Sequence, residues 1–141
     1  MKWRLITALS GLGLLMGFAS VAGFSGGREG VAWLVIAAIS AFVLSRSVPH
    51  AAFRHGFVAG LIGGIPAPLT QVALFPTYLA NNPEMATKFQ QVPGGMSARG
   101  FVLAITPIIG VGSGLVLGVL ALAASRLFGS RRRSTAAREG M

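Results

Sequence analysis

Four long runs of apolar residues constrain the fold of this chain more than any other feature. They cover about residues 5–24, 31–45, 56–79 and 101–128. A helix of ~20 apolar residues is long enough to cross the ~30 Å hydrocarbon core of a bilayer. The sequence therefore predicts an all-α fold, an integral membrane four-helix bundle.

The composition agrees with this prediction. Apolar residues make up 53% of the 141 residues and charged residues 11%, whereas a soluble domain carries about 25% charged residues. We expect a single membrane domain over residues 1–128, followed by a basic tail over residues 129–141. The chain contains no cysteine, which excludes disulfides, thiolate metal sites and cysteine nucleophiles.

The first run has two interpretations. Small residues at Ser20 and Ala22 could mark the cleavage site of a secretory signal. Because three further runs follow, we favour a retained spanning helix.

Basic residues indicate the orientation in the membrane. Four spans place both ends of the chain on one side, and nine basic residues fall on that side against three on the other. The nine are Lys2, Arg4, Arg46, Arg54, Arg126, Arg131, Arg132, Arg133 and Arg138, and the three are Arg28, Lys88 and Arg99. The positive-inside rule then predicts cytoplasmic termini. In the tail, Arg131, Arg132 and Arg133 are candidates for binding anionic lipid head groups.

Aromatic residues near the ends of the runs are candidate interface anchors. Trp3 lies at the expected inner boundary, and Trp33 and Tyr78 lie at the expected outer boundary. Tryptophan and tyrosine are enriched at these levels of a membrane.

Small residues recur at intervals of four, which places them on one face of a helix. The candidate packing residues are Gly56, Gly60 and Gly64 on the third run and Gly110, Gly114 and Gly118 on the fourth, with Gly13 and Gly17 on the first and Ala37, Ala41 and Ser45 on the second. Such faces allow helix backbones to approach closely in lipid. We expect the third and fourth spans to pack in this way, as in a glycine zipper, with self-association as the competing use.

The third run contains the stretch GGIPAP, in which a helix should kink or break. Pro66 and Pro68 follow Gly63 and its glycine neighbour, and each proline removes a backbone donor. The freed carbonyls, with Thr70 and Gln71, could bind a cation or a substrate, as in transporters with discontinuous helices. Alternatively, neighbouring groups satisfy these carbonyls and the kink is only structural.

A short helix is expected between the third and fourth spans. Asn82 is a candidate N-cap and Pro83 suits the first helical position. Met85, Phe89 and Val92 then recur at helical spacing opposite polar residues, which predicts an extracytoplasmic interfacial helix on the membrane surface.

The sequence offers no constellation that supports catalysis, so we expect no enzyme, no cofactor and no metal. The three acidic residues, Glu29, Glu84 and Glu139, lie outside the predicted spans, which argues against a carboxylate-based pump. His50 and His55 could bind a pigment or haem, but their spacing does not place both on one helical face. Two partly solvated histidines at the interface are the simpler expectation. The tail lacks the folded basic surface that nucleic-acid binding would need.

The stretch FPTYLANNPE resembles a family of small bacterial membrane proteins that is defined as a domain of unknown function. That family has four predicted helices and a Tyr-x-x-x-Asn-Pro element between the third and the fourth, which Tyr78, Asn82 and Pro83 match. The likeness covers the C-terminal half of the chain, where the segment before the last span is shorter and less acidic than is usual in the family. The resemblance implies a bacterial origin and this topology, and no chemistry.

Two functions remain open at this stage. The first is a structural or accessory subunit of the bacterial inner membrane, which packs through its helices against copies of itself or a larger complex. The second is a small oligomeric transporter or channel that uses the proline-broken third span.

Overall fold

A computed structural model describes residues 1–24 and 27–139, without the side chains of residue 93 and residues 129–139. The described part is helical and contains no strand. Its elements are α1 (Trp3–Val21), α2 (Gly27–Ser47), the 3-10 helix η1 (Pro49–Ala51), α3 (Ala52–Gly63), α4 (Pro66–Ala73), α5 (Phe75–Asn81), α6 (Pro83–Phe89), the 3-10 helix η2 (Pro93–Gly95) and α7 (Ala98–Glu139). The predicted all-α fold is confirmed.

Four segments are long and apolar enough to cross a membrane, as predicted, but their limits differ. They are Trp3–Val21, Gly27–Ser47, Pro49–Ala73 and Ala98–Phe128. The second span begins four residues before its predicted start at 31, so Glu29 belongs to it. The third span ends at Ala73, not at 79, because the chain leaves the helix at Leu74, whose φ is −106° and ψ 33°.

Prolines mark many of the helix starts. Five elements have proline at the first or second position, where its missing N–H has no helical partner to lose. Pro107 is different, because it lies inside the continuous helix α7. The prolines of the third run therefore act mainly as helix starts.

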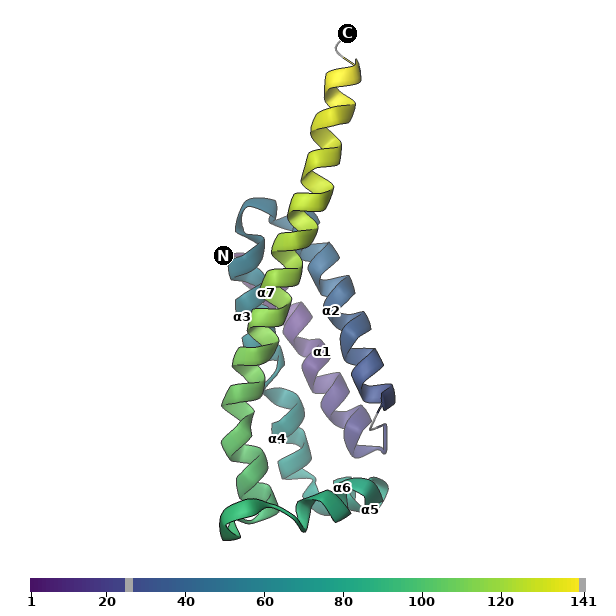
Figure 1. Cartoon of the computed structure of the whole chain (residues 1–141), viewed down its shortest axis with the longest axis vertical. Helices are drawn as coiled ribbons and strands as arrows, with labels where there is room; N and C mark the ends of the chain where they lie inside the picture. Colours follow the sequence, from purple (N-terminus) through teal and green to yellow (C-terminus); the bar gives the residue numbers. More distant parts are fainter. Residues whose placement is uncertain (25–26, 140–141) are drawn as a thin grey trace.

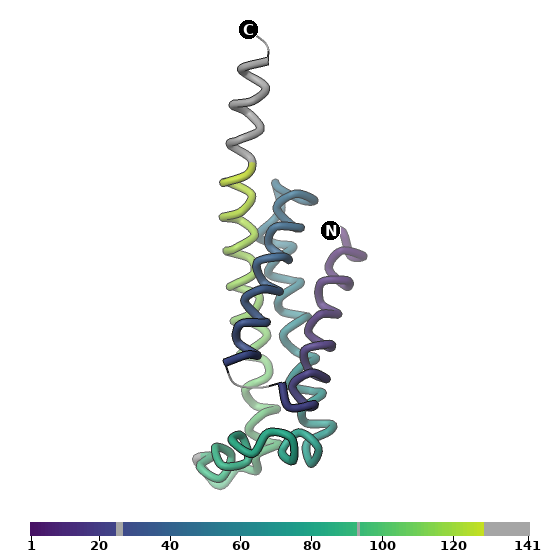
Figure 2. Tube along the Cα trace, turned by 90° about the vertical axis from the view of Figure 1, so that its right-hand side faces the viewer, coloured from purple at the N-terminus to yellow at the C-terminus, as the bar shows by residue number. Residues whose placement is uncertain are grey.

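Figure 1 shows α1, α2, α3 and α7 running side by side, with α4 continuing from α3 and with α5 and α6 lying across one end of the bundle. The tube view in Figure 2 shows the same arrangement from the side. α3 contacts both α7 and α1, whereas α2 packs chiefly on α7 and touches α1 little.

Hydrogen bonds and ring contacts identify the two ends of the bundle. At one end, the Lys2 backbone N–H donates to His55 and its ammonium to the Ser47 carbonyl oxygen, both at 3.0 Å. The Phe42 and Phe128 rings meet there at 5.5 Å. The N-terminus and the end of the fourth span therefore share this face, which we call the terminal end. The opposite end is the α5–α6 end.

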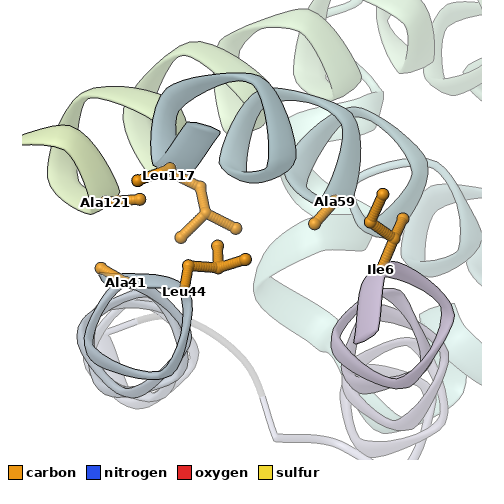
Figure 3. Close-up of a cluster of buried hydrophobic side chains, with 7 residues drawn as sticks. Ile6, Ala41, Leu44, Ala59, Leu117 and Ala121 are labelled. Atoms are coloured by element: carbon orange, nitrogen blue, oxygen red, sulfur yellow. The ribbon is translucent and has the colours of Figure 1, made fainter. Parts of the chain in front are cut away.

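Each end has a buried apolar cluster. The cluster nearer the terminal end joins all four spans, and Figure 3 shows Leu44 and Leu117 pointing toward each other while Ile6 of α1 approaches Ala59 of α3. The cluster at the α5–α6 end is smaller and contains Phe75. Burial of this apolar area fixes α5 against the ends of α1 and α7.

The helix predicted between the third and fourth spans exists and begins at Pro83. Its apolar face does not lie free, because Met85 and Phe89 pack on the cluster at the α5–α6 end and the Phe89 ring is 5.6 Å from that of Phe75. The Asn82 side chain makes no capping hydrogen bond to this helix. The protein itself therefore covers part of the apolar face that was expected to face lipid.

Candidate functional site

The glycines of the third and fourth spans lie against each other's helices. A Cβ placed on Gly60 would be 2.5 Å from the Ser113 carbonyl oxygen, and one on Gly114 would be 2.7 Å from that of Phe57. Gly56, Gly64, Gly110 and Gly118 have comparable neighbours on the facing helix, all within 3.2 Å. Because a real Cβ rarely comes closer than about 3.4 Å, the backbones of α3 and α7 leave no room for side chains here.

A second close approach joins α1 to the third span. A Cβ on Gly13 would collide with the Gly63 carbonyl group, and one on Gly17 would be 2.9 Å from Ala67 and Thr70. The Ser10 hydroxyl adds a hydrogen bond of 3.1 Å to the Ala59 carbonyl oxygen. The region of the predicted break is therefore covered by α1.

The third span is kinked at Gly64 and Ile65. Both residues keep right-handed helical dihedral angles, with φ of −75° and −83°. The Gly64 N–H donates to the Gly60 carbonyl oxygen at 2.8 Å, and the Leu69 N–H donates to that of Ile65 at 3.3 Å. Helical hydrogen bonds thus continue on either side of the kink, and the chain is bent without being unwound.

Thr70 and Gln71, the polar candidates of this span, have different partners. The buried Thr70 hydroxyl donates to the Pro66 carbonyl oxygen at 2.8 Å, one turn earlier in α4. The Gln71 amide donates to the Ser20 hydroxyl oxygen at 2.9 Å and so reaches α1. The Thr70 hydrogen bond thus stays within α4, whereas the Gln71 hydrogen bond joins α4 to α1 as part of a network between helices.

Glu29 joins this network, contrary to the expectation that no glutamate lies in a span. The fully buried Ser20 hydroxyl donates to the Glu29 carboxylate at 3.5 Å, and the Trp33 side chain lies near that carboxylate. The network therefore connects α1, α2 and α4. Sequence reasoning missed it because the second span was expected to begin at residue 31, which placed Glu29 outside it.

Asn82 and Tyr78 complete the polar cluster beyond the third span. The Asn82 amide donates to the backbone oxygens of Ser20 and Tyr78, at 2.9 and 2.8 Å, while its own oxygen Oδ1 is buried without a hydrogen-bond partner. Burial raises the pKa of Tyr78 above its ordinary 10.0, and the nearby charge of Glu29 raises it further, against a smaller lowering by the Ser20 hydrogen bond. Tyr78 is thus held as a neutral phenol.

Tyr78 does not anchor the chain to the membrane surface as predicted, because only 3% of its surface is exposed. A new helix, α5, starts after Leu74 and turns the ring toward α1 and Phe75. Trp3, in contrast, is exposed at the terminal end, and Trp33 is half-buried. Arg131, Arg132 and Arg133 lie outside the side chains that the structure describes.

The two histidines have separate environments. His50 is exposed, but His55 is buried, so the expectation that it is partly solvated is wrong. The His55 Nε2 accepts the Lys2 backbone N–H, and Nδ1 lies 2.9 Å from the Ala51 carbonyl oxygen. Both ring nitrogens are occupied, and this histidine ties the start of α1 to the start of α3.

An apolar hollow of about 260 Å³ lies among α1, α2, α3 and α7. Leu9 and Gly13 line it from α1, while residues from Gly30 to Ser40 line it from α2. It exists because α2 leans on α7 and stays clear of α1. Trp33 lines the hollow and also lies near the carboxylate of Glu29.

The fold and these sites define a helical protein with four segments of the length and apolarity that a multi-pass membrane protein requires. Comparison with protein-family models, with curated proteins and with solved structures gave no match for this chain. The resemblance to a family of small membrane proteins is therefore carried by the stretch FPTYLANNPE alone.

Proposed function

We propose that this protein is a structural or accessory subunit of a bacterial inner membrane, which acts through helix packing with copies of itself or with a larger membrane complex. The observation that carries the proposal is the self-contained interior. The buried hydroxyls of Ser10, Thr70 and Thr106 all donate to backbone carbonyls of the chain itself. An interior of this kind suits a packing element better than a conduit, whose polar groups must be free for a solute.

The glycine faces are occupied within the chain, so a partner has to contact another surface. α2 is the least buried of the four spans. Its side chains Val35, Ile39 and Phe42 are 52%, 55% and 46% exposed. We therefore assign the partner contact to this outer face of α2.

Cysteine cross-linking in native membranes tests this assignment, because the chain has no cysteine of its own. Ile39→Cys on α2 should give a cross-linked species with a second protein, either another copy or a different chain. Ile108→Cys is the matched control, since Ile108 is 70% exposed on α7. Equal behaviour of the two variants would contradict a specific contact on α2.

The proposed orientation places both termini in the cytoplasm. The terminal end carries Lys2, Arg46 and Arg126 among the nine basic residues counted on that side, against three at the other end. The basic side would also attract anionic lipid head groups. A membrane-impermeant maleimide added to intact cells should label Thr87→Cys at the α5–α6 end and spare His50→Cys. The reverse pattern would overturn the orientation.

An oligomeric transporter or channel is the second candidate, and one observation favours it. Gln71, just past the kink, is linked through Ser20 to the carboxylate of Glu29. Flux of ions or small solutes into liposomes should then fall in Gln71→Leu, while Thr70→Val should retain it because that hydroxyl bonds within α4. Absence of flux in the unmodified chain would reject this candidate.

A further inference from the structure

The hollow among α1, α2, α3 and α7 has the depth of one membrane leaflet. Along α2 it extends from Gly30 to Ser40, and ten residues of helix rise by about 15 Å. One leaflet occupies about half of the ~30 Å hydrocarbon core. The lining is apolar over most of this length, as with Leu9, Ile36 and Leu117. A single hydrocarbon chain that enters from the α5–α6 side matches both the depth and the lining.

A carboxylate lies next to the end of the hollow near the α5–α6 side. Gly30 and Trp33 line the hollow, and Glu29 is the residue before Gly30 and lies near the Trp33 side chain. In the described part of the chain, the hydrogen-bond partner of this carboxylate is the Ser20 hydroxyl, and no cation pairs with it. Glu29 is half-buried, and a half-buried carboxylate is stabilised by a cation that approaches it.

A cationic side chain occupies the adjacent face of α2. Arg28 precedes Glu29 in the first turn and is exposed, with its guanidinium 5.7 Å from the centre of the Phe24 ring. The start of α2 thus presents a negative group beside the hollow and a positive group next to it. Guanidinium groups favour phosphate, and carboxylates favour protonated amines.

We propose that the hollow binds one acyl chain of a phosphatidylethanolamine, with the protonated amine of the head group on Glu29 and its phosphate on the side of Arg28. The zwitterionic head group carries a positive amine that complements Glu29 and a negative phosphate that complements Arg28. A lipid whose amine carries three methyl groups keeps the positive charge but lacks the N–H donors, so it should bind less well. The proposal is independent of the contact assigned to the outer face of α2.

Tryptophan fluorescence can test this site directly. The chain has two tryptophans, and Trp3→Phe leaves Trp33, in the wall of the hollow, as the sole emitter. The protein is reconstituted in vesicles that contain a small fraction of lipid with brominated acyl chains, which quench tryptophan on contact. Brominated phosphatidylethanolamine should reach half-maximal quenching at about tenfold lower mole fraction than brominated phosphatidylcholine. Equal quenching by the two lipids would overturn the proposal.

Variants separate the two parts of the site. In the Trp3→Phe background, Glu29→Gln should abolish the preference between the two lipids, while Glu84→Gln on the exposed face of α6 should preserve it. Ala37→Phe should fill the hollow and reduce quenching by both lipids several-fold, whereas Ala38→Phe, next to it on the exposed face of α2, should not. Quenching that is unchanged in Ala37→Phe would show that the lipid lies elsewhere. A preference that survives in Glu29→Gln would exclude the carboxylate as the amine's partner.

Discussion

Adding a single methyl group at two positions of the fourth span should distinguish the cost of helix packing from the other effects of a glycine-to-alanine substitution. Gly114 and Gly112 lie two residues apart on α7, and neither has a side chain. A Cβ on Gly114 would be 2.7 Å from the Phe57 carbonyl oxygen and 3.2 Å from the Leu61 nitrogen, whereas one on Gly112 would meet nothing within 4 Å. Gly114→Ala and Gly112→Ala therefore make the same chemical change on two faces of α7, one that contacts α3 and one that does not.

The magnitude follows from the distances. To restore ordinary contact, α7 has to move away from α3 by about 0.7 Å, and a gap of that size loses about a quarter to a half of the dispersion energy of the atoms along the interface. Overpacking of this kind costs about 1–3 kcal/mol. Both variants also gain up to about 1 kcal/mol because alanine favours the helix over glycine. This gain in helix propensity is the same in Gly114→Ala and Gly112→Ala. The difference between their free energies of unfolding, about 1–3 kcal/mol, is therefore the cost of packing.

Unfolding of the purified protein by SDS in mixed micelles, followed by tryptophan fluorescence, measures this difference. Gly112→Ala should unfold at the same or a higher SDS fraction than the unmodified chain, and Gly114→Ala at a lower one. If the two variants unfold together, the backbones of α3 and α7 are not in the contact described.

Three further predictions concern the rest of the bundle. Gly13→Ala should lower the free energy of unfolding by about 1–3 kcal/mol relative to Gly11→Ala, because a Cβ on Gly13 would strike backbone atoms and one on Gly11 would meet nothing within 4 Å; equal SDS midpoints would refute the close approach of α1. Asn82→Ala should cost about 1–3 kcal/mol, since it removes two buried hydrogen bonds, and more than Asn81→Ala, which removes one partly exposed bond; the same titration measures both. Tyr78 is the only tyrosine, so phenolate absorbance reports it alone, and its midpoint in the folded protein should lie above 10.0 and return to about 10 in SDS. The stability that this neutral phenol contributes is complete below pH 10.0 and is lost as the pH rises through the raised pKa, so a midpoint at or below 10.0 would contradict its burial.

The large elements could be predicted from the sequence because lipid allows few solutions. Apolar runs of sufficient length gave four spans, and all four are present as helices. Pro83 was correctly expected to start a helix, since its fixed φ suits the first helical turn. The spacing of Gly60 and Gly64 predicted a face without side chains that packs on the fourth span, and in the structure this face meets α7.

The polar cluster could not be predicted, because it depends on contacts between residues far apart in the chain. Glu29 was expected outside the spans, and its place beside Ser20 follows from where α2 starts. Tyr78 was assigned to the membrane surface, and its burial follows from the turn of the chain at Leu74. Asn82 was expected to cap α6 with its side chain, but that amide reaches the backbone of α1 instead. In each case a tertiary contact outweighed a local signal.

The mass of the particle released from its native membrane, measured by native mass spectrometry in mild detergent, tests the proposed function most directly. A structural or accessory subunit should leave the membrane with at least one further protein chain, so the particle should exceed the 14.5 kDa of a single chain by the mass of that partner. Ile39→Lys, on the exposed face of α2, should reduce the particle toward 14.5 kDa while the chain stays inserted. A native particle that contains a single 14.5 kDa chain and no other protein, with or without bound lipid, would contradict the account.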